Sequence, residues 1–149
     1  MIRNGYYGKF NNKIYPITIS DNTVYVLSND EDDFNNGFIK NSNYTENNSY
    51  LYRYYLSVCI EDIEWFCSIR TYGYYKGFKV WLAGEDKSEY SIMTGIVPLG
   101  NEIFTPNNGF KQYDRQIYVG NVPVSEITGI YETKSRINEE HKAPDNWDF

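Results

Sequence analysis

The sequence has no long hydrophobic segment and a single histidine. No run of apolar residues approaches the ~20 that cross a bilayer as a helix, which argues against a membrane-spanning helix. The first residues, Met1 to Gly5, contain no apolar stretch, so we expect no secretory signal there. His141 lies among charged residues in a polar segment near the end of the sequence. Because a general base must be held within hydrogen-bond reach of its proton, histidine catalysis is not expected.

The short motifs that carry phosphate, metal or nucleophile chemistry are also missing. The patterns GxxxxGK[ST], GxGxxG, GxSxG and HExxH do not occur. The acidic run that begins at Asp30 resembles a calcium loop only superficially, since Phe34 would occupy the third ligand position and offers no oxygen. The sequence therefore predicts a protein that is not an enzyme and that holds no metal and no cofactor.

Cysteine is scarce, with Cys59 and Cys67 as the only two. Their spacing fits neither a CxxC redox pair nor half of a four-ligand zinc site. Both have apolar neighbours, so we predict two buried free thiols in a reducing environment. This pattern favours a cytoplasmic location.

Basic residues are fewer than acidic ones: 14 Lys and Arg stand against 20 Asp and Glu, a formal net charge of −6. Binding to nucleic acid or anionic lipid needs clustered cations, so direct contact with either is not expected. An acidic face accelerates association with a basic protein. The same charge also keeps a protein soluble, and both explanations stay open.

Aromatic residues are the abundant class: 16 Tyr, 8 Phe and 3 Trp, or 18% of 149 residues. Tyrosine and β-branched residues favour strands, and no window keeps helical spacing over three turns. The sequence therefore predicts an all-β, mainly antiparallel fold, with short helical turns within 58–65 and 122–130 and an exposed loop over 41–49. Segments of strand character cover residues 13–19, 23–27, 50–60, 64–70, 78–82, 89–94, 96–99, 115–119 and 129–133.

Four sequence echoes in the same order along the chain indicate an internal duplication. Residues 6–10 resemble 74–78, residues 21–27 resemble 86–92, and residues 35–38 recur unchanged as 107–110. In the last echo, 55–63 resembles 118–127, so that Ile63 and Ile127 become equivalent core residues after a helical turn capped by Ser or Glu side chains. The expected unit is a small SH3-like or Tudor-like barrel, closed or nearly closed. A single β-sandwich is the alternative.

The duplication divides the chain into three parts. We expect a first barrel-like half over residues 1–70, a second half over 71–133 packed on the first, and a polar, flexible tail over 134–149. A half of this size buries only about 60% of its unfolded surface. We therefore expect the two halves to share an apolar seam of aromatic side chains.

Binding is better supported than catalysis, because aromatic side chains bury much area at small entropic cost. The candidates form an acidic group, expected in a solvated loop that docks a basic partner, and an aromatic group for hydrophobic contact. They are Asp30, Glu31, Asp32 and Asp33 in the acidic group, and Tyr50, Tyr52, Tyr54, Tyr72, Tyr74 and Trp81 in the aromatic group.

Two segments carry a resemblance to a known class of proteins. NGYYGKFNNKIY (residues 4–15) and VSEITGIY (residues 124–131) resemble the small cytosolic immunity or antitoxin proteins encoded beside polymorphic toxin genes in Gram-positive bacteria. The resemblance implies neutralisation of a toxin, for example a nuclease. An acidic inhibitor would mimic the phosphates of the nuclease's substrate and be steered to its basic cleft.

Three functions are therefore considered. The favoured one is a non-enzymatic, cytosolic protein-binding protein, with an immunity or antitoxin protein as its specific form. The alternative is a module that binds a peptide or small ligand in a groove between the two halves. The third is an enzyme that uses carboxylates alone, which should show a concave pocket holding carboxylates of raised pKa.

Overall fold

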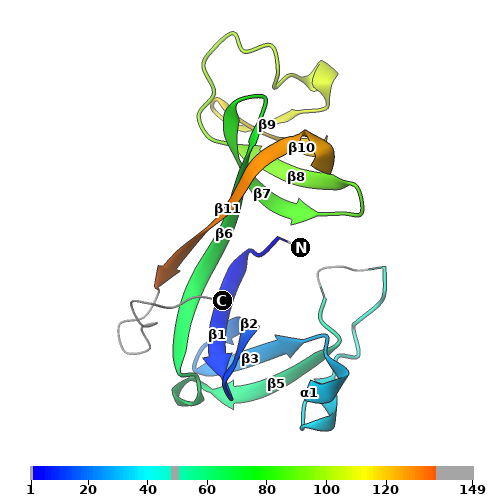
Figure 1. Cartoon of the computed structure of the whole chain (residues 1–149), viewed down its shortest axis with the longest axis vertical. Helices are drawn as coiled ribbons and strands as arrows, with labels where there is room; N and C mark the ends of the chain where they lie inside the picture. The colour runs from blue at the N-terminus through cyan, green and yellow to red at the C-terminus, as the bar shows by residue number, and fades with distance from the viewer. Residues whose placement is uncertain (1, 48–50, 137–149) are drawn as a thin grey trace. The chain divides into compact units, whose positions relative to one another are not determined.

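The computed structural model describes residues 2–47 and 51–136, and Figure 1 labels most of its elements. Contacts between residues divide this part of the chain into two compact units. The N-terminal unit consists of Gly5–Ser68 with Ser135 and Arg136, and the C-terminal unit consists of residues 2–4 and Ile69–Lys134. Among the features predicted above, Tyr50, His141 and residues 137–149 of the tail lie outside the described residues.

The N-terminal unit is a series of strands joined by short connections. Its elements are β1 (Gly5–Phe10), β2 (Lys13–Ser20), β3 (Thr23–Ser28), α1 (Glu31–Asn35), β4 (Ile39–Lys40), β5 (Tyr54–Cys59), the 3-10 turn η1 (Ile60–Asp62) and the first residues of β6 (Trp65–Tyr75). Hydrogen bonds give the strand order β4-β5-β3-β2-β1-β6. Asn11 and Asn12 have φ values of 48° and 63°, the backbone of a two-residue hairpin turn. This turn fixes the register of β1 against β2.

The C-terminal unit continues from the remaining residues of β6. Its further elements are β7 (Phe78–Glu85), β8 (Glu89–Thr94), the 3-10 turn η2 (Pro106–Asn108), β9 (Lys111–Asp114), β10 (Ile117–Pro123), the 3-10 turn η3 (Val124–Glu126) and β11 (Ile127–Arg136). Hydrogen bonds give the order β9-β10-β8-β7-β6, with β11 paired to β6. Lys76 and Gly77, with φ values of 47° and 83°, form the hairpin turn between β6 and β7.

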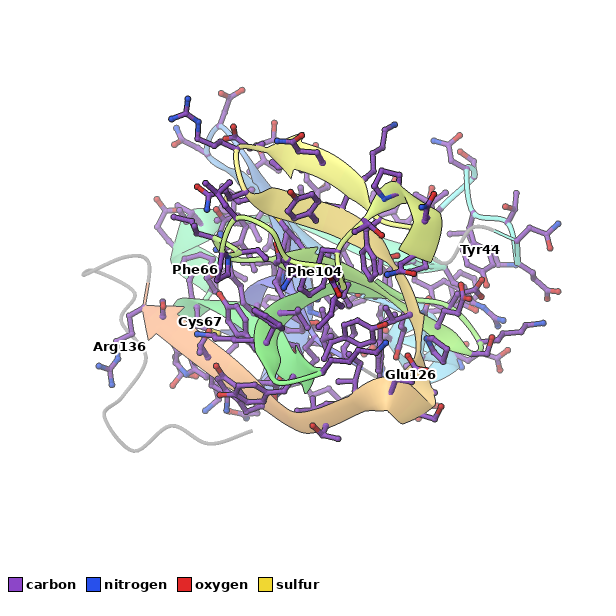
Figure 2. All side chains as sticks on the ribbon, turned by 90° about the horizontal axis from the view of Figure 1, so that it is seen from above. Tyr44, Phe66, Cys67, Phe104, Glu126 and Arg136 are labelled. Carbon is purple, nitrogen blue, oxygen red and sulfur yellow. The ribbon has the colours of Figure 1, made fainter. Side chains whose placement is uncertain are left out.

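Each unit has a hydrophobic core made of its own residues. The alternation of strand side chains sends every second residue inward. The buried core of the N-terminal unit consists of Tyr15, Ile17, Val24, Val26, Phe38, Tyr54, Ile63 and Phe66. That of the C-terminal unit consists of Tyr75, Val80, Leu82, Ile92, Val97, Phe104, Phe110, Val122 and Ile127. Figure 2 labels one member of each core, Phe66 and Phe104. The seam between the halves stays a prediction.

The two units repeat one strand order. Replacing β1, β2, β3, β4, β5 and β6 by β6, β7, β8, β9, β10 and β11 converts the first order into the second. The registers agree as well: Lys40 lies opposite Tyr54, and Gln112 lies opposite Tyr118. Phe38 and Phe110 precede β4 and β9, are buried, and their amides donate to the carbonyls of Asp33 and Thr105, each at 3.1 Å. The third echo thus joins residues in equivalent places.

One echo is out of register with the observed strands. The first echo predicts that residues 6–10 correspond to 74–78, whereas the hairpins place Gly8 opposite Tyr15 and Gly73 opposite Val80. Gly8 therefore corresponds to Gly73, three residues away from the alignment of that echo. The echo matches the tyrosine pair of residues 6 and 7 with that of residues 74 and 75. The register of a hairpin is set by its turn, and the echo does not match the two turns with each other.

The all-β, antiparallel class is confirmed, and both predicted helical turns are found as η1 and η3. Closed SH3-like or Tudor-like barrels are not confirmed, because the strands form an open hydrogen-bonded series. Neither 3-10 turn has a side-chain cap. Residues 96–99 are not a strand, and residues 134–136, predicted to be tail, belong to β11.

A close backbone approach recurs at the equivalent glycines, and it predicts an effect on stability. A Cβ atom at Gly73 would lie 2.7 Å from Cγ2 of Ile127, and one at Gly8 would lie 3.0 Å from Cγ2 of Ile63. Gly73→Ala should therefore lower the free energy of unfolding by about 1–3 kcal/mol through overpacking, measured by urea denaturation. Gly84→Ala is the control, because its Cβ would meet nothing closer than 3.8 Å. Equal stabilities of the two variants would contradict the prediction.

Candidate functional site

The outer face of β6, β7 and β8 in the C-terminal unit carries a row of large side chains. On β6, Thr71 and Tyr75 are buried, so that Tyr72 between them points to the other face. The register of the sheet places Tyr72 opposite Trp81 on β7, and Trp81 opposite Met93 on β8. These three half-buried side chains therefore lie side by side across three strands.

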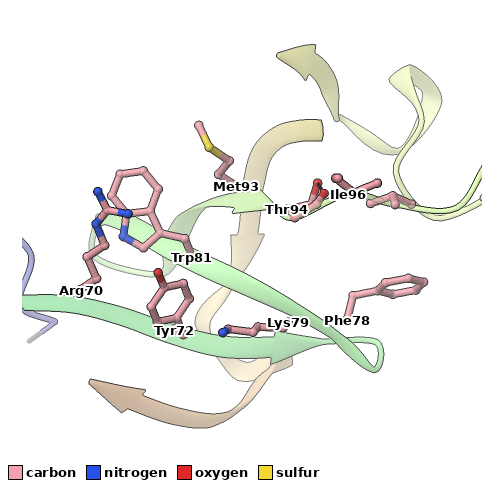
Figure 3. Close-up of a pocket in the computed structure, with 10 residues that line it drawn as sticks. Arg70, Tyr72, Phe78, Lys79, Trp81, Met93, Thr94 and Ile96 are labelled. Atoms are coloured by element: carbon pink, nitrogen blue, oxygen red, sulfur yellow. Dashed lines mark hydrogen bonds between the residues drawn. The ribbon is translucent and has the colours of Figure 1, made fainter. Parts of the chain in front are cut away.

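This row forms the floor of a groove with a volume of about 460 Å³, which we call the β6–β8 groove (Figure 3). The residues after β8 contribute to its lining, and among them Ile96 is 77% exposed. The lining residues are Arg70, Tyr72, Phe78, Lys79, Trp81, Met93, Thr94, Gly95, Ile96 and Val97. All belong to the C-terminal unit, and the set includes neither carboxylate, histidine nor cysteine.

The indole of Trp81 is held by Asn4, a residue distant in sequence. Nε1 of Trp81 donates to Oδ1 of Asn4 at 2.9 Å, and the same oxygen accepts the backbone amide of Thr71 at 3.0 Å. The side-chain amide of Asn4 in turn donates to the carbonyl of Leu82 at 2.7 Å. Because Asn4 forms hydrogen bonds with both β6 and β7, it holds the Trp81 ring in one orientation.

Two cations lie against the aromatic rings of the groove. The guanidinium of Arg70 lies 5.7 Å from the centre of the Trp81 ring, and the Lys79 ammonium lies 4.5 Å from the centre of the Tyr72 ring. Tyr72 also stacks on Tyr131 of β11, with ring centres 5.7 Å apart. A hydrogen bond with the Tyr131 side chain raises the pKa of Lys79. The Arg70 and Lys79 side chains are both positioned by cation–π contacts.

The acidic candidates do not form a solvated loop. Asp30 caps the short helix α1, where its carboxylate accepts the backbone amide of Asp32 at 2.9 Å. Asp33 is buried, and its two carboxylate oxygens accept the hydroxyls of Tyr15 at 2.7 Å and of Ser28 at 2.6 Å. The predicted role of Asp33 in docking is thus replaced by a role in the core of the unit. Asp30, Glu31 and Asp32 remain exposed.

The electrostatics of Asp33 follow from these contacts. Burial by itself would raise the pKa of the carboxyl group. The hydrogen bonds from Ser28 and Tyr15, together with the Lys13 ammonium at 3.5 Å, outweigh burial and hold the pKa of Asp33 below its usual value. Burial and the bond to Asp33 also raise the pKa of Tyr15.

The aromatic candidates separate into buried and groove residues. Tyr54 is buried and stacks on Phe34, with ring centres 5.2 Å apart. Tyr52 is partly buried, which raises the pKa of its hydroxyl. Tyr72 and Trp81 meet in the groove, while Tyr74 lies beside it with its ring centre 6.4 Å from that of Tyr131.

Sequence reasoning missed Arg70, Lys79, Met93 and Ile96 as site residues. A signal was present for Arg70, because it shares the strand alternation of Tyr72 and Tyr74. The cysteine prediction was half wrong, since Cys67 is buried but Cys59 is exposed; neither forms a disulfide within the described residues.

Within residues 2–47 and 51–136, no group of three or more His, Cys, Asp or Glu side chains is arranged to hold a metal ion. The helices in this part of the chain are all too short or too polar to cross a membrane.

Comparison with known proteins identifies a family for almost the whole chain. The sequence profile of the family described as "Uncharacterised conserved protein UCP033725" matches residues 2–139, a range that includes both units and the β6–β8 groove. Neither the curated proteins nor the solved structures give a match. Because the matched range is far more than half of the 149 residues, the chain belongs to this family, UCP033725.

Proposed function

We propose that the protein is a non-enzymatic, cytoplasmic protein-binding protein and that it binds its partner through the β6–β8 groove. The observation that carries the proposal is the row of Tyr72, Trp81 and Met93 on an open sheet face, with Arg70 beside it. Tyr, Trp, Met and Arg are the residue types enriched at the centres of protein interfaces. Trp, Tyr and Arg also dominate measured binding energies.

The surroundings of the groove support a protein partner. Ile96 in the lining is 77% exposed, and Leu99 of the same connection is 86% exposed. Exposed apolar side chains next to a concave aromatic floor are typical of interaction sites. A lining that offers no carboxylate, histidine or cysteine supports binding over acid–base or nucleophilic catalysis. The thiols of Cys59 and Cys67, which form no disulfide within the described residues, support a reducing compartment.

An immunity or antitoxin role stays a prediction from the sequence. If the protein docks a basic toxin through its acidic residues, the exposed Glu31 and Asp32 of α1 would make the contact, since Asp33 is buried. This surface lies in the N-terminal unit, whereas the groove lies in the C-terminal unit. The two surfaces can therefore be tested separately.

The test is quantitative capture of partners from the native cell by immobilised full-length protein. Trp81→Ala and Ile96→Asp should each lower capture of the specific partner by about tenfold or more, the range expected for residues at the centre of an interface. Tyr113→Ala and Ile39→Asp are the matched controls, because both side chains are exposed, at 66% and 54%, and neither lines the groove. Mass spectrometry identifies and quantifies the bound proteins.

A third arm reverses the charge of the acidic helix with Glu31→Lys and Asp32→Lys. Capture that depends on Trp81 and Ile96 but not on these two residues supports the groove. Capture that survives both groove variants refutes the proposed site. Capture lost only on charge reversal would assign the interaction to α1 instead. Ile96→Asp guards against misfolding as an explanation, because the exposed Ile96 side chain contributes little to the core.

A further inference from the structure

The cations of the β6–β8 groove have no anionic partner within the described residues. Ion pairs join Arg3 to Glu132, Lys9 to Glu64, and Lys13 to Asp30 and Asp33, whereas Arg70 and Lys79 form none within residues 2–47 and 51–136. The groove lining itself contains no carboxylate. In a chain with 20 acidic against 14 basic residues, a groove lined by two cations and no carboxylate is a local departure from the overall charge.

We propose that the β6–β8 groove receives an acidic peptide segment of the partner protein, whose carboxylates pair with Arg70 and Lys79 while an apolar side chain packs on Tyr72, Trp81 and Met93. This inference rests on the proposed function and specifies its ligand. Charge complementarity supports it, because hydrogen bonds between a cation and a carboxylate are the strong ones. The rings beneath Arg70 and Lys79 restrict both side chains beforehand, which lowers the entropic cost of pairing.

A peptide fits this groove better than a nucleic acid strand does. A single strand needs a track of cations along its backbone as well as stacking platforms, and the groove lining offers two cations. The net charge of −6 would also repel a polyanion. A short acidic segment carries fewer charges, and at the Debye length of about 8–10 Å it interacts chiefly with the nearby Arg70 and Lys79. The groove volume of about 460 Å³ lies within the usual range for ligand sites.

The probe is a library of blocked hexapeptides with a central Phe, Leu, Tyr or Val flanked by Asp and Glu. A second library replaces Asp and Glu by Asn and Gln, and oligothymidylate of matched length serves as the nucleic acid probe. Binding to the full-length protein is followed by the indole N–H signal of Trp81 in NMR spectra. The protein variants are the double change Arg70→Gln with Lys79→Gln, and a matched control, Lys87→Gln with Arg115→Gln. The control removes the same charge from exposed sites outside the groove.

We expect acidic peptides to shift the Trp81 signal and to bind the control as they bind the natural protein. The groove variant should bind the acidic peptides at least about tenfold more weakly than the natural protein does, as for the loss of charged hydrogen bonds. The natural protein should bind the neutral library at least about tenfold more weakly than the acidic library, for the same reason. Added salt should weaken binding of the acidic library only. Any one of four results would overturn the inference. They are equal binding of both libraries, equal binding of the acidic peptides by the groove variant, no shift of the Trp81 signal at millimolar peptide, and binding of oligothymidylate in place of peptide. If Trp81-dependent capture of a protein persists in any of those cases, the proposed function stands and only the acidic ligand is wrong.

Discussion

Replacing Phe104 by alanine is expected to lower the free energy of unfolding of the C-terminal unit by about 3–5 kcal/mol, the usual cost of removing a buried aromatic ring. Phe104 is 2% exposed, and its ring contacts those of Phe78, Phe110 and Tyr118, with centres 5.4, 5.0 and 6.3 Å away. The ring also lies 6.0 Å from that of Tyr75. Because it touches so many rings, its removal leaves a cavity that no single neighbour can fill.

Urea unfolding followed by tryptophan fluorescence measures this effect. In a background of Trp65→Phe and Trp147→Phe, Trp81 is the only tryptophan and reports on the C-terminal unit. The control is Tyr113→Ala, which removes an aromatic ring that is 66% exposed and should change the free energy of unfolding by about 0.5 kcal/mol or less. A midpoint for Phe104→Ala equal to that of the control would mean that Phe104 is not a core residue.

Replacing Asp33 by alanine is expected to cost about 3 kcal/mol or more at neutral pH. The change removes two hydrogen bonds to a charged acceptor, each worth about 1.5–3 kcal/mol. It also leaves the hydroxyls of Tyr15 and Ser28 without this partner and deprives Lys13 of one of its carboxylates. Asp32→Ala, on the same helix but exposed, is the control for the loss of a negative charge.

The stability difference between the natural protein and Asp33→Ala should also depend on pH. The pKa of Asp33 is lowered in the folded protein, so that its contribution is fully present above the ordinary aspartate value of about 3.9. The contribution is lost as the pH falls through the lowered pKa of the folded state. Urea midpoints of both proteins, measured at neutral pH and at a series of pH values from about 4 downward, test this. A difference that stays constant throughout the acid range would contradict the stated role of the Asp33 carboxylate.

Local patterns in the sequence predicted the parts of the fold that depend on neighbouring residues. Period-two alternation and tyrosine content predicted the strands, and the recurring segments around Phe38 and Phe110 and around Ile63 and Ile127 identified equivalent core residues. The prediction of a strand at 96–99 was wrong. An apolar run forms a strand only when a neighbouring strand can pair with it. Here Ile96 and Leu99 are exposed instead.

The structural roles of the acidic residues could not be predicted from the sequence. Helix α1 spans Glu31–Asn35, too short for helical periodicity to be visible. The burial of Asp33 depends on Tyr15, which is eighteen residues away in the sequence and is joined to Asp33 only by the folded register. Long-range pairing of this kind has no local signature.

The candidate site was predicted in part. Tyr72 and Trp81 were chosen for their residue type, and the sheet brings them together. The sequence does not single out Arg70 and Lys79, because net charge describes the whole chain, whereas binding depends on the charges within a few ångströms of the ligand.

The uninterrupted strand β6 makes the architecture extensible. Its first residues end the strand order of the N-terminal unit, and its last residues begin that of the C-terminal unit, so that one strand belongs to both orders. The ten-residue strand β11 stands in the same relation to β6 as β6 does to β1. A designer who continued β11 into a further hairpin could therefore use its last residues to begin a third series of strands in the same order.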